Sequence, residues 1–345
     1  MNIALIALAT DQTPIAPPLT LAYIAAALEQ QRHIVRLYDL ALTPHSSSDQ
    51  PARLLRSFRP KVAVIVGLGQ ELPTSVAAEL ASQHTLVLPL YSARDEVRPV
   101  QAYGDVVGWL QRQGLGRDER SVIQRRMQPD ADGIDALPFP ARHLVALECY
   151  GLRACGGELL TTLLIGQRAA SGDGYELRAP KAIVNELRAV AREHGVRHYR
   201  FCGAPITTDR IWLGGLLQAL AQANIEIAWE GAVQPQQLDP ELLPQMRAAG
   251  CEALRFDFNA PEVLESANAR LSLRQIVAQT RHHGIYARAE LTLEHPYESI
   301  PQLVDVAATF GLDAVRFMAS AVRPPRHDAT NVEQMAQRLY SAGRS

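Results

Sequence analysis

The feature that most constrains the fold of this chain is an alternation of strand and helix signals that repeats from residue 159 to the last residues. Short apolar segments, such as residues 199–202 and 253–258, alternate with longer segments of helical period. Several helical segments end where a glycine follows, as at Gly195 and Gly250, which is the usual left-handed cap. Strands that alternate with helices predict an α/β fold with a parallel sheet. Six such units in about 185 residues predict a partial (β/α)6 barrel, because the complete barrel has eight units.

A shorter alternation of the same kind covers the N-terminal third of the chain. Its expected strands are residues 2–9, 34–38, 62–67 and 86–90. The segment 62–67 is continuously apolar, which is typical of a strand covered on both faces. We therefore expect a small doubly wound, Rossmann-like domain at residues 1–113, a proline-interrupted linker at 114–157 and the barrel at 158–345.

Composition and charge argue against two kinds of partner. A chain of 345 residues with 47% hydrophobic content can bury a sizeable core. Its formal charge of −2 gives no basic field for nucleic acid. No apolar run approaches the roughly 20 residues that span a bilayer, and the apolar N-terminus lacks both a basic flank and a cleavage site. We expect a cytoplasmic protein with no nucleic-acid partner and no membrane partner.

The four cysteines, Cys149, Cys155, Cys202 and Cys251, form no CxxC pair and accompany no histidine pair at metal spacing. Their spacing therefore predicts no metal site. Cys149 and Cys155 lie close enough in sequence to meet in a loop, so a metal site shared with a partner chain stays open. Buried or incidental thiols are the more usual case in an intracellular chain.

The expected barrel strands carry charged residues two positions apart. Because alternate residues of a strand point to opposite faces, one face is expected to meet the helices and the other the lumen. The lumen face should carry nine candidate ligand-binding residues: Arg200, Cys202, Glu230, Arg255, Asp257, Arg288, Glu290, Glu294 and Arg316. A barrel core is normally branched and apolar, so this charge needs an explanation.

Two interpretations of the charged lumen are open. In the first, it is a site for a zwitterionic or anionic small molecule, with arginines holding carboxylates or phosphates and Glu230, Asp257 and Glu290 receiving an amine. In the second, the same residues fill the cavity as mutual ion pairs, because burying an unpaired charge costs several kcal/mol.

Two further segments also have two interpretations each. Glu294 and His295 end a strand, where barrel chemistry takes place, so they are candidates for an acid or base, although a solvated strand end is more usual. The Gly-rich residues 166–174 precede a helix and offer backbone amides to a phosphate, although a surface loop is the commoner outcome.

Several long stretches of the sequence occur in the order and at the spacing that are typical of one protein family. They include DGIDALPFPARHL at 132–144, RAPKAIVNELRAVAREHGVRHYRFCGAPIT at 178–207 and LEHPYESIPQLVDVAATFGLDAVRF at 293–317. In these stretches the chain resembles the cobalamin-binding-domain radical S-adenosylmethionine (SAM) proteins over nearly its whole length. The resemblance implies an N-terminal Rossmann-like cobalamin domain and a six-unit radical-SAM-type barrel. It also implies a CxxxCxxC loop that binds a four-iron cluster, which cleaves SAM to a radical.

The chain departs from that family where the cofactors bind. The cluster loop falls at residues 166–175, which read GQRAASGDGY and contain no cysteine, whereas three thiolates are needed to hold the cluster. The SAM-binding element of the fourth strand is replaced around Asp257, and the corrin turn at 90–94 reads LYSAR, without the glycines that let a backbone approach the corrin. We expect no [4Fe-4S] cluster, while cobalamin or SAM binding remains open.

These departures favour a degenerate member of the family that keeps the fold without the cluster. Its expected role is that of a non-radical ligand-binding or partner subunit beside an active radical SAM enzyme or another enzyme of a biosynthetic pathway. The alternative is an enzyme that binds cobalamin or SAM in the lumen for methyl transfer or other non-radical chemistry.

Overall fold

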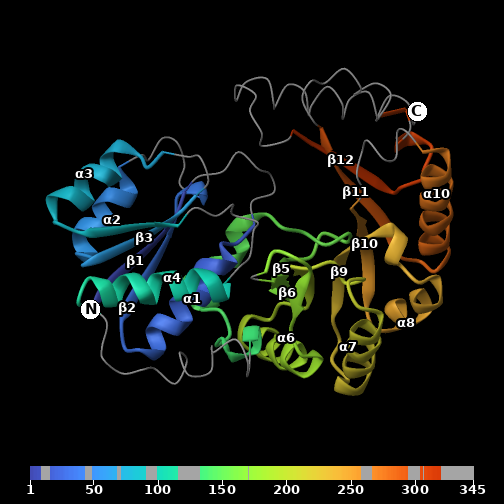
Figure 1. Ribbon diagram of the computed structural model, residues 1–345, viewed down its shortest axis with the longest axis horizontal. Coiled ribbons are helices and arrows are strands. Elements are labelled where there is room, and N and C mark those ends of the chain that lie inside the picture. Colours follow the sequence, from blue (N-terminus) through green and yellow to red (C-terminus); the bar gives the residue numbers. More distant parts are fainter. Residues whose placement is uncertain are drawn as a thin grey trace. The chain divides into compact units, whose positions relative to one another are not determined.

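The computed structural model describes ten segments of the chain: residues 1–8, 16–42, 49–67, 71–90, 99–115, 133–169, 171–257, 266–293, 304–305 and 307–319. The chain divides into two compact units, Met1–Val196 and Arg197–Ser345 (Figure 1). The domain boundaries expected at residues 113 and 157 stay a prediction. In the described segments no helix is long and apolar enough to cross a membrane.

The first unit contains a four-stranded parallel sheet in the order β2-β1-β3-β4. Its strands are β1 (Asn2–Ala7), β2 (Ile34–Asp39), β3 (Val62–Val66) and β4 (Leu86–Leu90). The two central strands, β1 and β3, are buried almost throughout, which is why both are continuously apolar in sequence.

Helices cover both faces of this sheet. They are α1 (Leu19–Gln30), α2 (Gln50–Phe58), α3 (Thr74–Ser82) and α4 (Pro99–Arg112). Alternate residues of β1 enter different cores: Ile3 and Leu5 pack with α1 and α4, whereas Ala4 and Ile6 pack with α2 and α3. The predicted doubly wound arrangement is therefore present.

The rest of the first unit begins with short 3-10 turns and ends in a helix. After η1 (Leu40–Leu42), which follows β2, these elements are η3 (Gly133–Ala136), η4 (Arg142–Leu144), η5 (Leu147–Tyr150), β5 (Leu160–Leu164), β6 (Gly166–Arg168), β7 (Tyr175–Leu177) and α6 (Pro180–His194). The proline-interrupted segment thus forms no regular helix or strand where it is described, as its prolines indicate.

The second unit contains five parallel strands in the order β8-β9-β10-β11-β12. They are β8 (His198–Cys202), β9 (Ala228–Val233), β10 (Cys251–Phe256), β11 (Tyr286–Leu293) and β12 (Ala314–Ala319). Between them come η6 (Pro235–Gln237), η7 (Pro240–Leu242) and the helices α7 (Arg210–Ala223), α8 (Leu243–Ala248) and α10 (Ala267–His282) (Figure 1). The predicted alternation and the parallel sheet are confirmed. The helix expected at 332–341 lies outside the described residues, and that expected at 300–310 lies only partly within them.

Candidate functional site

The strands of the second unit separate an apolar face from a charged face, as the sequence predicts. Tyr199 and Phe201 on β8 are buried, and Phe201 stacks on Trp229 of β9 with ring centroids 5.0 Å apart. On β8, Arg200 lies between Tyr199 and Phe201 and therefore points to the other face. Strand register places Arg200 opposite Glu230, and in the same way Arg255 lies opposite Arg288.

This charged face brings together eight of the nine candidate residues. They share strand parity and register, and they are Arg200, Cys202, Glu230, Arg255, Asp257, Arg288, Glu290 and Arg316. The ninth, Glu294, lies outside the described residues, as does His295. We call these eight residues the charged face.

One group of ion pairs is centred on Glu230. Nε of Arg200 lies 2.5 Å from Oε1 of Glu230, and Nη1 of Arg288 lies 3.2 Å from Oε2 of the same carboxylate. The side chain of Glu230 is only 12% exposed, so its two oxygens are shared between two cations with little access to water. The pairing fixes the orientation of both guanidinium groups.

A second group is centred on Arg255 and Glu290. Nε of Arg255 lies 3.3 Å from Oδ1 of Asp257 and 3.6 Å from Oε2 of Glu290, and Nη1 of Arg316 lies 3.8 Å from Oε1 of Glu290. Burial, which by itself would lower the pKa of Arg255, is outweighed by Glu290 and Asp257, so that pKa is raised. For Asp257 burial dominates over the attraction of Arg255, and the pKa of this carboxyl is raised. The protein environment therefore favours the protonated form of Asp257 more than water does.

The thiols supply no metal site in the described part of the chain, where no three cysteine, histidine or acidic side chains come together. None of the four cysteines is in a disulfide. Burial raises the pKa of Cys251 well above its usual value, so this thiol is held protonated. A metal site shared by Cys149 and Cys155 with a partner stays a prediction.

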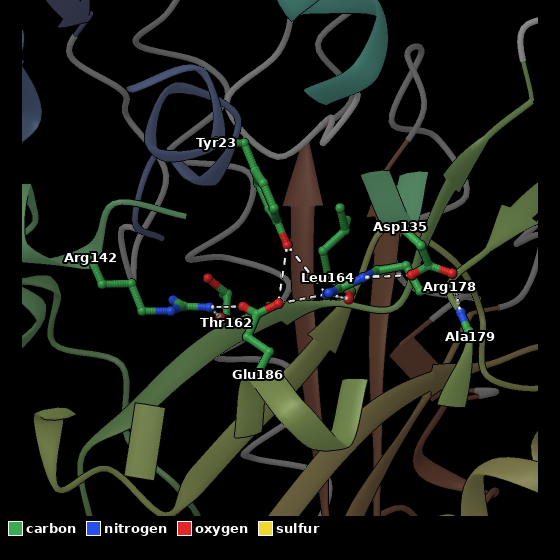
Figure 2. A network of polar contacts seen from close by, with 8 residues as sticks. All are labelled: Tyr23, Asp135, Arg142, Thr162, Leu164, Arg178, Ala179 and Glu186. Carbon is green, nitrogen blue, oxygen red and sulfur yellow. Dashed lines mark hydrogen bonds and ion pairs between the residues drawn. The ribbon is translucent and has the colours of Figure 1, made fainter. Parts of the chain in front are cut away.

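The first unit holds a buried ionic network that the sequence reasoning missed (Figure 2). At its centre Glu186 of α6 accepts a hydrogen bond of 2.8 Å from Nη2 of Arg142 and one of 2.6 Å from Nη1 of Arg178. The side chains of Glu186, Arg142 and Arg178 are 0%, 4% and 3% exposed. The hydroxyl of Tyr23, on α1, donates to Glu186 over 3.3 Å. We call these four residues the buried network.

Backbone carbonyls of β5 complete the buried network. Nη2 of Arg142 donates to the carbonyl of Thr162, and Nη1 of Arg178 donates to that of Leu164, both over 2.8 Å. Burial tends to raise the pKa of Glu186, but Arg178 and Arg142 outweigh it and the pKa is lowered. The network therefore joins α1, η4, β5 and α6 by charge-assisted bonds within the first unit.

A signal for this network was present in the sequence. Glu186 lies in the row of α6 that also carries Ile183, Leu187 and Val190, all of them buried. A carboxylate among core positions of a helix must find a cation, because an unpaired buried charge is strongly unfavourable. The two arginines themselves come from irregular segments, where periodicity gives no guidance.

The segment expected to be a Gly-rich loop is instead a β-hairpin. Strands β6 and β7 pair antiparallel, and across them Nε2 of Gln167 donates to Oε2 of Glu176 over 2.8 Å. The other oxygen of Glu176 accepts from the amide of Ile134 over 2.8 Å, which ties the hairpin to η3. Its side chains include no cysteine. The residues at this position therefore do not fit a cluster that requires thiolate ligands.

A short buried segment packs at the carboxyl ends of β8 and β9. The amide of Ile206 donates to the carbonyl of Ala232 over 2.9 Å, and Oγ1 of Thr207 accepts from the amide of Gln234 over 3.0 Å. Ile206 is fully buried, and a Cβ on Gly231 would lie only 2.9 Å from its Cγ2. Apolar packing thus occupies this strand end beside the charged face.

With the geometry established, comparison with known proteins defines the class of fold. No protein-family model matches the chain, and no curated protein matches it in sequence. In structure the chain is similar to radical SAM enzymes that also use cobalamin. This similarity confirms the predicted fold class, a Rossmann-like domain followed by a radical-SAM-type partial barrel.

Two of these enzymes are named proteins. The methyltransferase TsrM from Kitasatospora setae, with tryptophan and a SAM analogue bound, matches with a TM-score of 0.63 and 14% identity over 92% of this chain and 72% of TsrM. TsrM with cobalamin and a [4Fe-4S] cluster bound gives a TM-score of 0.58. The cobalamin-dependent SAM radical enzyme OxsB matches with a TM-score of 0.58 and 12% identity over 99% of this chain, which spans 55% of OxsB. At such identities the likeness concerns the fold alone.

Proposed function

We propose that this chain is a non-radical protein on a radical SAM fold, which binds a small zwitterionic or anionic molecule on its charged face. In this proposal it serves as a ligand-binding or partner subunit beside an active enzyme of the same pathway. The observation that carries the proposal is the hairpin β6–β7, which occupies the segment that corresponds to the cluster loop of the family it resembles.

The chemistry of the hairpin supports the non-radical part. A cluster that cleaves SAM is held by three cysteine thiolates, and residues 166–175 contain none. The polar side chains that the hairpin does have, Gln167 and Glu176, bond to each other across the strands. No step of radical chemistry is therefore assigned to this chain.

The charged face supports the ligand-binding part. Arginines held in place by carboxylates are suited to bind carboxylate or phosphate oxygens, and Glu230, Asp257 and Glu290 are suited to receive an amine. Each of these three carboxylates contacts at least one arginine of the face, so its orientation is fixed before a ligand arrives. Such preorganisation lowers the entropic cost of binding.

Anaerobic reconstitution with iron and sulfide tests the non-radical proposal. We expect background iron and no new absorbance after desalting. About four irons per chain, together with an absorbance near 400 nm that bleaches on reduction, would contradict it. A wild-type cobalamin-dependent radical SAM enzyme treated in parallel shows that the reconstitution works.

A second candidate function is binding of SAM or cobalamin for polar methyl transfer. The observation that favours it is the likeness to TsrM, whose structures contain a SAM analogue in one case and cobalamin in the other. Residues 91–94 of the expected corrin turn lie outside the described residues. Calorimetry with SAM and with hydroxocobalamin decides between the candidates: saturable heat with either ligand favours the enzyme, and no heat with both favours the non-radical partner.

A further inference from the structure

Two arginines of the charged face, Arg200 and Arg255, use few of their nitrogens in the described part of the chain. Arg200 and Arg255 contact carboxylates of the face only through Nε, at 2.5 Å from Glu230 and 3.3 Å from Asp257. Within the described segments, neither Nη1 nor Nη2 of these two arginines has a hydrogen-bond partner. The ion-pair interpretation accounts for the charge of this face but leaves the terminal nitrogens of both guanidinium groups unused.

That geometry leaves the guanidinium edge suited to an anion. A carboxylate on Nε fixes the plane of the guanidinium group, and the two terminal nitrogens then present parallel N–H donors, which match two oxygens of a carboxylate or phosphate. The side chains of Arg200 and Arg255 are 21% and 30% exposed, so water covers only a small part of each. An oxyanion bound there is screened much less than one at an open surface.

Strand register sets the spacing of the two arginines. Arg200 pairs with Glu230, which pairs with Ala253, two residues before Arg255 on β10. Two strand spacings of about 4.8 Å and a rise of about 3.3 Å per residue place their Cα atoms about 12 Å apart. Both side chains start from the same face of the sheet, and two arginine side chains together with one short molecule are long enough to bridge this spacing.

Charge on the face agrees with an anionic ligand. Its described part carries four arginines, Arg200, Arg255, Arg288 and Arg316, against three carboxylates, Glu230, Asp257 and Glu290. Asp257 is the most exposed of the three, with 44% of its side chain accessible. Among the described arginines it contacts Arg255, and it does so through Nε, which leaves the terminal nitrogens of Arg255 to a ligand.

We propose that the charged face binds a short dianion, one anionic group on the terminal nitrogens of Arg255 and the other on those of Arg200. This inference rests on the proposed function, whose ligand it narrows from any charged small molecule to one with two oxyanion groups. The groups are carboxylates or phosphates, since both offer the paired oxygens that the guanidinium edge requires.

Calorimetry on the full chain at low salt tests the dianion with ligands of similar length. The probes with two oxyanion groups, called dianions here, are glutarate, a dicarboxylate, and 3-phosphoglycerate, a phosphorylated carboxylate whose phosphate adds about one more negative charge at pH 7. The controls are γ-aminobutyrate as zwitterion and butyrate as monoanion. We expect at least one of the two dianions to bind at least about tenfold more tightly than butyrate, since a second bidentate contact adds to the first. The tighter of the two identifies whether the second group is a carboxylate or a phosphate.

Single substitutions assign the contacts. Arg255→Lys and Arg200→Lys keep the charge but remove the two-donor edge, so each is expected to lower dianion affinity to the level of butyrate. Arg281→Lys is the matched control, because Nε of Arg281 is likewise held by a carboxylate, Asp313, but on helix α10 away from the charged face. It should leave dianion affinity unchanged. Circular dichroism melts establish that each variant is folded.

Three outcomes overturn the inference. The first is that dianions bind the wild-type protein no more tightly than butyrate does. The second is that Arg255→Lys and Arg281→Lys lose dianion affinity equally, which would indicate a general charge effect. Binding of γ-aminobutyrate without binding of either dianion overturns the dianion and leaves the proposed ligand-binding function standing. The iron reconstitution is independent of all these titrations, so failure of the non-radical proposal is recognised separately.

Discussion

The buried network of the first unit and the charged face of the second are built from the same two kinds of side chain, yet they differ in what their arginines bind. In the buried network, Arg142 and Arg178 donate to Glu186 and also to backbone carbonyls of β5. On the charged face, Arg200 and Arg255 donate to described residues through Nε alone. The first arrangement is suited to hold chain segments together, and the second is suited to receive a ligand.

An arginine–carboxylate pair therefore does not by itself indicate a structural or a ligand-binding role. What distinguishes the two cases is burial together with the remaining hydrogen-bond capacity of the guanidinium group. A fully buried pair is strongly destabilising when one partner is removed, because the other charge is left uncompensated. The pairs of the charged face are less deeply buried, with 21% of Arg200 and 12% of Glu230 exposed, so water takes part of a missing partner's place and the loss is smaller.

The largest expected effect is on the buried network. Glu186→Gln removes the carboxylate that Arg142 and Arg178 share and leaves Arg178 with Asp135, whose Oδ1 lies 3.6 Å from its Nε. We expect the substitution to lower the free energy of unfolding by about 3–5 kcal/mol, because two buried cations lose a bonded anion. Urea denaturation of both proteins measures the difference. Glu193→Gln, on the same helix with 57% of its side chain exposed, is the control and should change little. Equal stability of wild type and Glu186→Gln would break the distinction between the two regions.

The same residue gives a pH dependence. The pKa of Glu186 is lowered from its usual 4.5 in the folded protein, so its stabilising contribution is fully present above that value and is lost as pH falls through the folded pKa. We expect the wild type to lose stability in acid more steeply than Glu186→Gln does. Unfolding curves between about pH 7 and pH 3 measure both slopes. Parallel slopes would show that Glu186 is not the group responsible.

An intermediate effect is expected where the hairpin meets η3. A Cβ at Gly133 would lie 2.0 Å from Oε1 of Glu176, and the backbone φ of Gly133 is +45°, which an alanine adopts only with strain. Gly133→Ala should cost about 1–3 kcal/mol of unfolding free energy. Gly104→Ala in α4 is the matched control, because nothing lies within 4 Å of its Cβ and alanine favours helix, so it should be neutral or stabilising. Thermal melts of both variants measure the difference. Equal melting temperatures would contradict the close contact between Gly133 and Glu176.

The smallest expected effect is on the pH dependence of dianion binding to the charged face. The pKa of Asp257 is raised above its usual 3.8, chiefly by burial, while Arg255 lowers it and Glu290 raises it. Protonation of Asp257 removes a negative charge beside Arg255, so dianion affinity should rise by about two- to fivefold as pH falls from about 7 toward the raised pKa. Calorimetry at several pH values measures it. Asp257→Asn should bind as the protonated wild type does and lose this pH dependence; a slope that persists in the variant would assign it to another group.

Sequence reasoning succeeds where a pattern repeats. Alternating strand and helix signals predict the parallel α/β fold, and residue parity along the expected strands places Arg200, Glu230 and Arg255 on one face, where β8, β9 and β10 hold them. The partners within that face are not predictable in the same way, because arginine side chains are long and register between strands is set by packing.

Sequence reasoning fails where no period exists. Strands β6 and β7 have three residues each, too few for alternation to be recognised, so the sequence predicts a loop where the hairpin lies. The arginines of the buried network lie in short irregular segments, and only the carboxylate of Glu186 in an apolar helix row signals that a cation must be near. The buried network also joins residues as distant in sequence as Tyr23 and Glu186, a contact that local patterns do not encode.

The hairpin also sets a limit on redesign. Of residues 166–175, those of β6 and the first residue of β7 belong to the antiparallel ladder. Alternate residues of a strand point to opposite sides, so cysteines placed at neighbouring positions of β6 would diverge instead of converging on one metal cluster. To engineer a radical enzyme from this chain, the backbone of the segment would have to be rebuilt before its side chains were exchanged.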